Sequence, residues 1–467
     1  MQIEDSAPTE RDVGGWFGSP EARFGVVLWA IVLAGLIGRV VYVVVIRGEA
    51  LYSDSLGYHF RAHLLADGEG FVLPAQQVLG LAENPPDAQI PPAWSLVLAV
   101  MAKLGLRSIL SQQLVGCVVG AATIAMTGIA GRAAFGRRAG LIAAGIVAVY
   151  PNVWIYEGEL MSEPLAMLGV ATCIWLAYRF LENPSLRIAV GLGATVGLLA
   201  LTRSEQIAIA LFVVVPVVLS AREILWRRRL AWLALAGATC ILVIAPWVLY
   251  NATRFDRPVL LSTGLGGAMR AGNCPATYRG PLLGYFKVDL RIGDPDGCSI
   301  LEEAFSSDQS IADGQLRRAA TEFMQENRSR VPVVVAARIG RTFNFFRPFQ
   351  QVHFEATRLS PVWVPRLGLF TYWILFPLAV LGTVIARRRK TPIYPVLAFP
   401  AVVVLAAALT IGAVRYRAPA EVPLALLAAV AIDALVGRWE RRRTVSNDPE
   451  PSAVLERHRR SPAPEEH

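Results

Sequence analysis

A cluster of ionisable residues follows the first long apolar run of the chain. The run covers residues 24–46, and LYSDSLGYHFRAHLLADGEGF, residues 51–71, comes shortly after it. This stretch holds Asp54, Tyr58 and His59 among other polar residues. Ionisable side chains beside lipid are costly, and proteins that keep them typically use them. A carboxylate here could deprotonate an attacking hydroxyl in a group-transfer reaction.

A second group of acids lies in the turn IYEGELMSEP, which contains Glu157, Glu159 and Glu163. Glu163 lies about a turn inside the next apolar run, so solvation explains it less well than it explains the other two. Carboxylates from both clusters, facing one cavity, would suit a base and a group that positions the acceptor or a cation. For Asp54 alone, simple solvation in a wet loop is an equally good explanation.

Arginines at the ends of apolar runs complement these acids. Arg203 precedes Glu205 in TRSE, and Arg415 and Arg417 lie in VRYRAP. Cations at the lipid boundary suit an anionic head group, especially a phosphate whose tail stays in the bilayer. The alternative is that each arginine snorkels or pairs with Glu205 or Glu421. As a set, we expect them to bind phosphate.

His59 and His63 are four residues apart, so a helix would place both on one face, with Asp67 one turn further. This spacing can hold a metal ion. However, HFRAH lacks the glutamate of the zinc-peptidase signature, and an interfacial amphipathic helix gives the same pattern. We therefore predict no metal and no other cofactor, with a divalent metal as the alternative.

The composition indicates an all-α polytopic membrane protein. Of 467 residues, 54% are hydrophobic and 17% are charged, against about 25% charged residues in soluble proteins. Runs of about 20 apolar residues, the length of a membrane-spanning helix, recur along the chain. The net charge of +9 comes from basic residues in short loops, which is typical of the positive-inside bias. We expect contact with membrane lipids and not with nucleic acid, because no basic stripe with interleaved aromatic residues is present.

Placing the basic clusters in the cytoplasm determines how the chain threads the membrane. The predicted spans lie near residues 24–46, 109–131, 139–155, 164–181, 188–201, 206–220, 230–250, 363–385, 393–411 and 420–437. These spans are nearly free of internal charge. Residues 92–106 are apolar but too few to cross, so they form a re-entrant or interfacial helix, or the outer part of a broken second span.

This threading divides the chain into five parts. They are a cytoplasmic segment (1–23), a transmembrane module (24–250) with a catalytic first external loop (47–93), an external lobe (251–361), C-terminal transmembrane helices (362–437) and a disordered cytoplasmic tail (438–467). The lobe contains Cys274 and Cys298. Thiols oxidise readily outside the cytoplasm, so we predict a disulfide between them, with two unpaired thiols as the alternative.

The order of these motifs resembles the GT-C class of membrane glycosyltransferases. The resemblance is to the family 39-like branch, which is related to protein O-mannosyltransferases and lipid A aminoarabinose transferases. The first external loop fits D-x-x-x-Y-H-x-x-A-x-x-L-x-x-G-x-G-F, and paired prolines before an aromatic residue follow it. MSEPL, LTRSE, APWVLYN, LLSTG with AGNC, and RYRAPAEVPLALL extend the resemblance over about residues 24–435.

The resemblance implies inverting transfer of a sugar from a polyprenyl-phosphate donor to a lipid, glycan or protein acceptor. The reaction would take place outside the bacterial plasma membrane. Asp54 matches the first-loop acid and would be the base, and Glu163 matches the acid that opens the helix after the second loop. Relatives usually carry Asp-Glu where this chain has Asp54-Ser55, which puts any role of the second acid in doubt. The candidates for binding substrate or phosphate are Tyr58, His59, Arg203, Glu205, Arg415 and Arg417.

Other functions remain open at this point. A lipid-linked glycan polymerase or ligase could use the large external lobe. A secondary transporter would place ionisable groups near the membrane midplane on broken helices, often with repeat symmetry, whereas here the acids gather at the outer rim. A non-catalytic scaffold is a further alternative.

Overall fold

The computed structural model describes residues 19–52, 54–80, 82–288, 298, 308–356 and 360–447. Within these ranges every regular element is a helix, and the only β-type pairing is an isolated bridge between Val72 and Pro86. The prediction of an all-α chain is therefore confirmed.

The helices of the first half run from the N-terminal span to the end of α11. They are α1 (Pro20–Val41), η1 (Tyr42–Arg47), α2 (Asp54–Asp67), α3 (Ala75–Leu79), α4 (Ala93–Lys103), α5 (Ile109–Phe135), α6 (Arg137–Val149), α7 (Pro151–Gly158), α8 (Glu163–Glu182), α9 (Leu186–Thr202), η2 (Ser204–Ala208), η3 (Ala210–Val214), α10 (Val215–Leu219) and α11 (Trp226–Ala252). The later ones are α12 (Gly264–Gly272), α13 (Pro275–Tyr278), α15 (Gln309–Glu326), α16 (Val331–Thr342), α17 (Pro348–Ala356), α18 (Trp363–Arg388), α19 (Tyr394–Leu409), η4 (Val414–Arg417) and α20 (Ala418–Asn447).

Each of the ten predicted spans falls on helical structure. Six helices are long and apolar enough to cross a membrane, or seven if the bent pair α6–α7 is one span. The other three predicted spans fall on the shorter apolar helices at 186–202, 204–219 and 394–409. The integral membrane character is thus confirmed, while a count of ten crossings is not.

Two local features shape the region that carries the acids. α6 and α7 meet at an angle of 46°, where Pro151 opens α7 and cannot donate the amide hydrogen bond that a continuous helix needs. α4 has 11 residues and rises only about 16 Å, roughly half the hydrocarbon thickness. α4 packs against α2, so the short apolar segment supports the helix that begins with Asp54.

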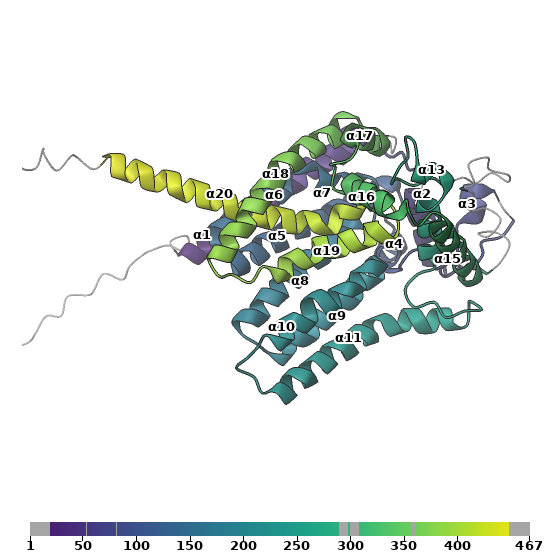
Figure 1. Cartoon of the computed structure of the whole chain (residues 1–467), viewed down its shortest axis with the longest axis horizontal. Coiled ribbons are helices and arrows are strands. Elements are labelled where there is room, and N and C mark those ends of the chain that lie inside the picture. The colour runs from purple at the N-terminus through teal and green to yellow at the C-terminus, as the bar shows by residue number, and fades with distance from the viewer. Residues whose placement is uncertain are drawn as a thin grey trace, which may run out of the picture.

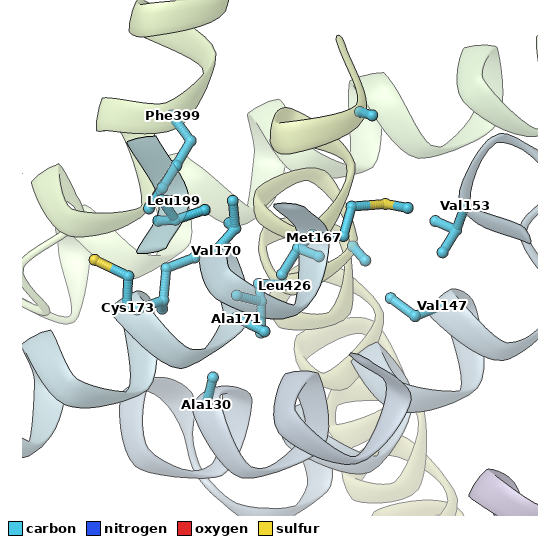
Figure 2. Close-up of a cluster of buried hydrophobic side chains, with 14 of the residues drawn as sticks. Ala130, Val147, Val153, Met167, Val170, Ala171, Cys173, Leu199, Phe399 and Leu426 are labelled. Carbon is cyan, nitrogen blue, oxygen red and sulfur yellow. The ribbon is translucent and has the colours of Figure 1, made fainter. Parts of the chain in front are cut away.

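The core is built around α8, which contacts α5, α9 and α20. Figure 2 shows apolar side chains from these helices and their neighbours meeting in one cluster. Small residues let the helix backbones approach closely, as is typical in membranes. A Cβ atom at Gly193 would collide with the Ala236 carbonyl, and one at Gly382 with the Leu427 carbonyl.

The loops divide between two ends of the bundle (Figure 1). One end, here called the loop-rich end, carries α2, α3, α13 and α15. The opposite, arginine-rich end carries the start of α1 and the far part of α20, where Arg138 donates to Glu440 at 2.9 Å. α20 continues to Asn447, so the expected disordered tail from residue 438 is wrong for its first ten residues, which continue the helix. Residues 1–18 and 448–467 lie outside the described part of the chain.

The segment between α11 and α18 forms a helical lobe around α12, α13, α15, α16 and α17. The structure joins Cys274 and Cys298 in the disulfide that we predicted. Arg338 and Arg341 of α16 are both buried and hold this lobe through backbone carbonyls: Arg338 donates to Gly272 at 2.6 Å and Arg341 to Leu283 at 2.6 Å. Within the lobe, α16 is thereby attached to α12 and to the chain that follows α13.

Candidate active site

Asp54 is the first residue of α2, and the residue after it explains how the loop turns into this helix. The Ser55 hydroxyl accepts a hydrogen bond from the Tyr52 amide at 2.8 Å and donates to the Tyr52 carbonyl at 2.7 Å. Ser55 is 2% exposed, so at the position where the resemblance implied a second acid this chain has a residue that supports the backbone. α2 therefore presents one carboxylate, that of Asp54, at its start.

Arg415 reaches this carboxylate from the far end of the sequence. It lies in η4, between α19 and α20, and its Nη1 atom is 2.7 Å from Asp54 Oδ2. Its Nε atom is 3.5 Å from Glu163 Oε1. A single guanidinium is thus shared between the two acids that the sequence analysis selected as catalytic.

Arg203 completes the connection from the other side of Glu163. Arg203 follows the last residue of α9, and its Nη1 donates to Glu163 Oε1 at 2.9 Å. Its Nε donates to Glu205 Oε1 at 2.6 Å. The guanidinium carbon of Arg203 also lies 5.1 Å from the centre of the Tyr416 ring, within the range of a cation–π contact.

Five of the predicted residues therefore form one continuous set of ion pairs, here called the charge network: Asp54, Arg415, Glu163, Arg203 and Glu205. The side chain of Asp54 is 43% exposed and that of Arg415 is 19% exposed, whereas that of Glu163 is 2% exposed. The network is accordingly reachable at its Asp54 end and closed at Glu163. Glu163 Oε2 has no hydrogen-bond partner among the described residues.

Tyr58 lies one turn along α2 from Asp54 and is 6% exposed. Burial, and then the negative charges of Glu163 and Asp54, raise the pKa of Tyr58 to about 12. The phenol is therefore protonated at neutral pH and can donate a hydrogen bond beside the two carboxylates.

Three of the predicted residues lie outside the network: Tyr58 lies beside it, and His59 and Arg417 have other partners. His59 is buried, and its Nδ1 is 2.8 Å from Gln112 Oε1 on α5, which makes it a contact between α2 and α5. Its ring faces His63 at a centroid distance of 4.4 Å.

Within the described residues no group of three or more histidine, cysteine, aspartate or glutamate side chains is arranged to hold a metal.

Arg417 also lies outside the network. Its Nε donates to Glu421 Oε1 at 2.7 Å, and both side chains are 1% exposed. A phosphate outside the protein cannot reach this guanidinium. The structure thus contains the pairing of Arg417 with Glu421, which was the alternative to phosphate binding.

The sequence analysis overlooked Arg39 and explained Glu157 by solvation, whereas the structure buries both side chains. Arg39 of α1 contacts Glu157 of α7 at 2.9 Å, with both side chains 1% exposed, and it donates to the carbonyls of Val147 and Ala148 at 3.0 Å each. The expectation of spans nearly free of charge is therefore wrong. Arg39 was visible inside the first apolar run, but its partner is 118 residues away and no local pattern identifies it.

Known proteins resemble the chain at two levels. Residues 89–250 match a family model described as dolichyl-phosphate-mannose-protein mannosyltransferase. The matched range includes Glu163, Arg203 and Glu205 but neither α2 nor η4. No curated protein sequence matches the chain.

Among solved structures, the Archaeoglobus fulgidus oligosaccharyltransferase tethered with an acceptor peptide containing the NVT sequon has a TM-score of 0.51 at 13% identity, covering 92% of this chain and 51% of that chain. The archaeal oligosaccharyltransferase AglB from the same organism, in complex with an inhibitory peptide and a dolichol-phosphate, has a TM-score of 0.49 at 13% identity, covering 93% and 53%. ArnT from Cupriavidus metallidurans bound to undecaprenyl phosphate has a TM-score of 0.40 at 14% identity, covering 93% and 82%.

The chain spans about half the length of the oligosaccharyltransferases that it matches. The family match and the shared all-helical fold agree with the resemblance found in the sequence. The chain is therefore a membrane protein with the fold of this oligosaccharyltransferase structure, and residues 89–250 match the mannosyltransferase family model.

Proposed function

We propose that the chain is an inverting glycosyltransferase that moves a sugar from a polyprenyl-phosphate donor to an acceptor hydroxyl, at the external face of a bacterial plasma membrane. The charge network carries this proposal. It brings Asp54, Glu163 and Arg415 together from α2, α8 and η4, although they are far apart in the sequence. The family match supports a lipid-phosphate sugar as the donor class.

Arg415 and Arg203 hold the donor phosphate in this proposal. Guanidinium groups bind phosphate through paired hydrogen bonds, and here they also stabilise the charge of the departing polyprenyl phosphate, so no general acid is needed. Arg415 contacts Asp54 in the free protein. A phosphate that draws Arg415 toward itself therefore weakens the ion pair between Arg415 and Asp54, which couples arrival of the donor to the base.

Asp54 then takes the proton of the acceptor hydroxyl. The acceptor oxygen attacks the anomeric carbon from the side opposite the phosphate, and the bond between that carbon and the phosphate oxygen breaks. Its electron pair leaves with the polyprenyl phosphate, and the anomeric configuration inverts. Glu163 holds both arginines through one carboxylate oxygen, and the protonated Tyr58 phenol supplies a hydrogen bond to the substrate.

The bridging position of Arg415 also bears on the need for a metal. A divalent cation placed between Asp54 and Glu163 would contact the same two carboxylates that Arg415 already shares. We therefore expect transfer to persist in EDTA at the rate measured without it, in membranes washed free of divalent ions. A loss of activity in EDTA that Mg²⁺ or Mn²⁺ restores would contradict this assignment.

The direct test is transfer of label in membranes that contain the full chain. A labelled polyprenyl-phosphate sugar should lose its label to an acceptor in wild-type membranes but not in membranes with Asp54→Asn. Transfer at the wild-type rate by a normally expressed Asp54→Asn protein would exclude Asp54 as the base.

A lipid-linked glycan ligase is the second candidate, because one matched fold is that of an oligosaccharyltransferase. The lipids of a deletion strain separate the two. Accumulation of a lipid-linked monosaccharide supports the proposed function, whereas accumulation of a lipid-linked oligosaccharide supports the ligase.

A further inference from the structure

Arg417 lies two residues after Arg415 but takes no part in the charge network. Its Nη1 donates to the Thr342 carbonyl at 3.1 Å, its Nε donates to Glu421, and its guanidinium carbon lies 3.7 Å from the centre of the Tyr372 ring. These partners belong to α16, α20 and α18. Arg417 thus connects η4 to three helices of the bundle.

The geometry of η4 explains why two arginines so close in sequence have different roles. A 3₁₀ helix has three residues per turn, so side chains two positions apart point to different sides. Arg415 points to Asp54 and Glu163, while Arg417 is 1% exposed inside the bundle.

The chain before η4 is held as well. The Gly412 amide donates to the Gly284 carbonyl at 3.1 Å, and its carbonyl accepts from Gln351 Nε2 at 3.4 Å. A Cβ atom at Gly412 would collide with the Gly284 carbonyl, so this approach requires glycine. The four residues of η4 are therefore fixed on both sides, by Gly412 before them and by Arg417 at their end.

Stability alone is a poor reason to keep a buried ion pair. The desolvation of both charges offsets most of their attraction, and apolar residues of similar volume are often as stabilising. The Arg417–Glu421 pair joins the last residue of η4 to the first turn of α20. It therefore constrains the backbone from which Arg415 extends.

We propose that Arg417 is a positioning residue for Arg415. Its attachment to Glu421, Tyr372 and Thr342 sets where the Arg415 guanidinium stands, and thereby how well the site binds the phosphate of the donor. The proposal rests on the proposed function of the charge network. It replaces the expectation that Arg417 itself binds phosphate.

The experiment measures binding of undecaprenyl phosphate, without a sugar, to the purified full-length protein in lipid nanodiscs. Arg417→Lys keeps the charge and can still pair with Glu421, but a lysine cannot form the planar stack and the fork of hydrogen bonds. We expect its affinity to fall about tenfold, which is the effect of losing about one hydrogen bond between Arg415 and the phosphate. Arg415→Ala, which removes the phosphate contact, should lose about 10- to 100-fold.

Arg39→Lys is the matched control. The Arg39–Glu157 pair is as buried as Arg417–Glu421 and joins α1 to α7. Arg39→Lys should lower the melting temperature as Arg417→Lys does, yet it should leave the affinity for undecaprenyl phosphate at the wild-type value. In a transfer assay, Arg417→Lys should raise the KM for the donor and leave the KM for the acceptor unchanged.

Unchanged binding by a folded Arg417→Lys protein would overturn the inference, and so would equal weakening by Arg39→Lys, which would indicate general destabilisation. If Arg417→Lys does not fold, Tyr372→Leu removes the ring that Arg417 contacts and changes no charge. It should weaken binding about threefold or more, because the cation–π contact that helps to hold Arg417 is lost. Wild-type affinity in Tyr372→Leu would also overturn the inference that Arg417 positions Arg415. Failure of the wild-type protein to bind undecaprenyl phosphate would instead show that the proposed phosphate site is wrong.

Discussion

Contacts between arginine and carboxylate occur in two different settings in this protein. In the closed pairs, Arg39–Glu157 and Arg417–Glu421, both side chains are 1% exposed and a single carboxylate faces each arginine. In the charge network, Arg415 is shared between two carboxylates, and the outermost acid, Asp54, is 43% exposed.

The difference shows which ion pairs can take part in chemistry. A closed pair has no access for a ligand, and removing one partner leaves an uncompensated buried charge. An arginine shared between two carboxylates at an accessible edge can exchange one of them for a phosphate. The candidate site therefore differs from the closed pairs in the exposure of its outer carboxylate and in the sharing of one arginine between two carboxylates, and not in its residue types.

The largest expected effect is that of Asp54→Asn at the open end of the network. General base catalysis typically contributes about 100- to 10,000-fold, so kcat should fall by that amount. Because Asp54 is 43% exposed, the melting temperature should stay near the wild-type value. A drop in melting temperature with kcat per folded molecule preserved would place Asp54 with the closed pairs.

Arg39→Ala tests a closed pair directly. Loss of one partner of a buried pair typically costs about 3–5 kcal/mol, so the free energy of unfolding in a denaturant titration should decrease by that amount. Transfer per folded molecule should not change. Adding Glu157→Gln should recover part of the lost stability, because the unpaired charge is then removed; no recovery would argue against this ion pair.

Arg203→Ala tests the buried centre of the network. A hydrogen bond to a charged group contributes about 1.5–3 kcal/mol, so the affinity for the donor should fall about 10- to 100-fold. Arg203→Lys retains the charge and should recover part of the lost affinity for the donor. An apparent donor affinity unchanged in Arg203→Ala would remove this residue from the phosphate site.

Glu205→Gln should have the smallest effect. Its side chain is 27% exposed, and Arg203 keeps its 2.9 Å contact with Glu163 when Glu205 is neutral. We expect a change in donor KM of less than about threefold, in line with the roughly 0–1 kcal/mol of accessible ion pairs. A larger change would show that Glu205 belongs to the centre of the site and not to its edge.

Much of the charge network could be predicted from the sequence because its members stand at the ends of apolar runs. Ends on one side of a membrane meet, which is how Asp54, Glu163, Arg203 and Arg415 were selected together. The sequence could not distinguish Arg415 from Arg417 in VRYRAP, because the 3₁₀ geometry of η4 determines which of them faces inward.

Burial and long-range pairing were equally inaccessible to sequence reasoning. His59 belongs to the loop pattern on which the resemblance in the sequence was based, yet its position on α2 directs it to Gln112. The partner of Arg39 is separated from it by six helical elements. The break at Pro151, in contrast, follows from the proline itself, although the sequence analysis treated residues 139–155 as one span.

α20 runs without interruption from Ala418 to Asn447. Its 30 residues form a rod about 45 Å long, which begins beside Arg415 and carries Glu440 near its other extremity. The contact between Arg138 and Glu440 ties that extremity to α6. One continuous helix therefore connects the backbone of η4 with the arginine-rich end of the bundle.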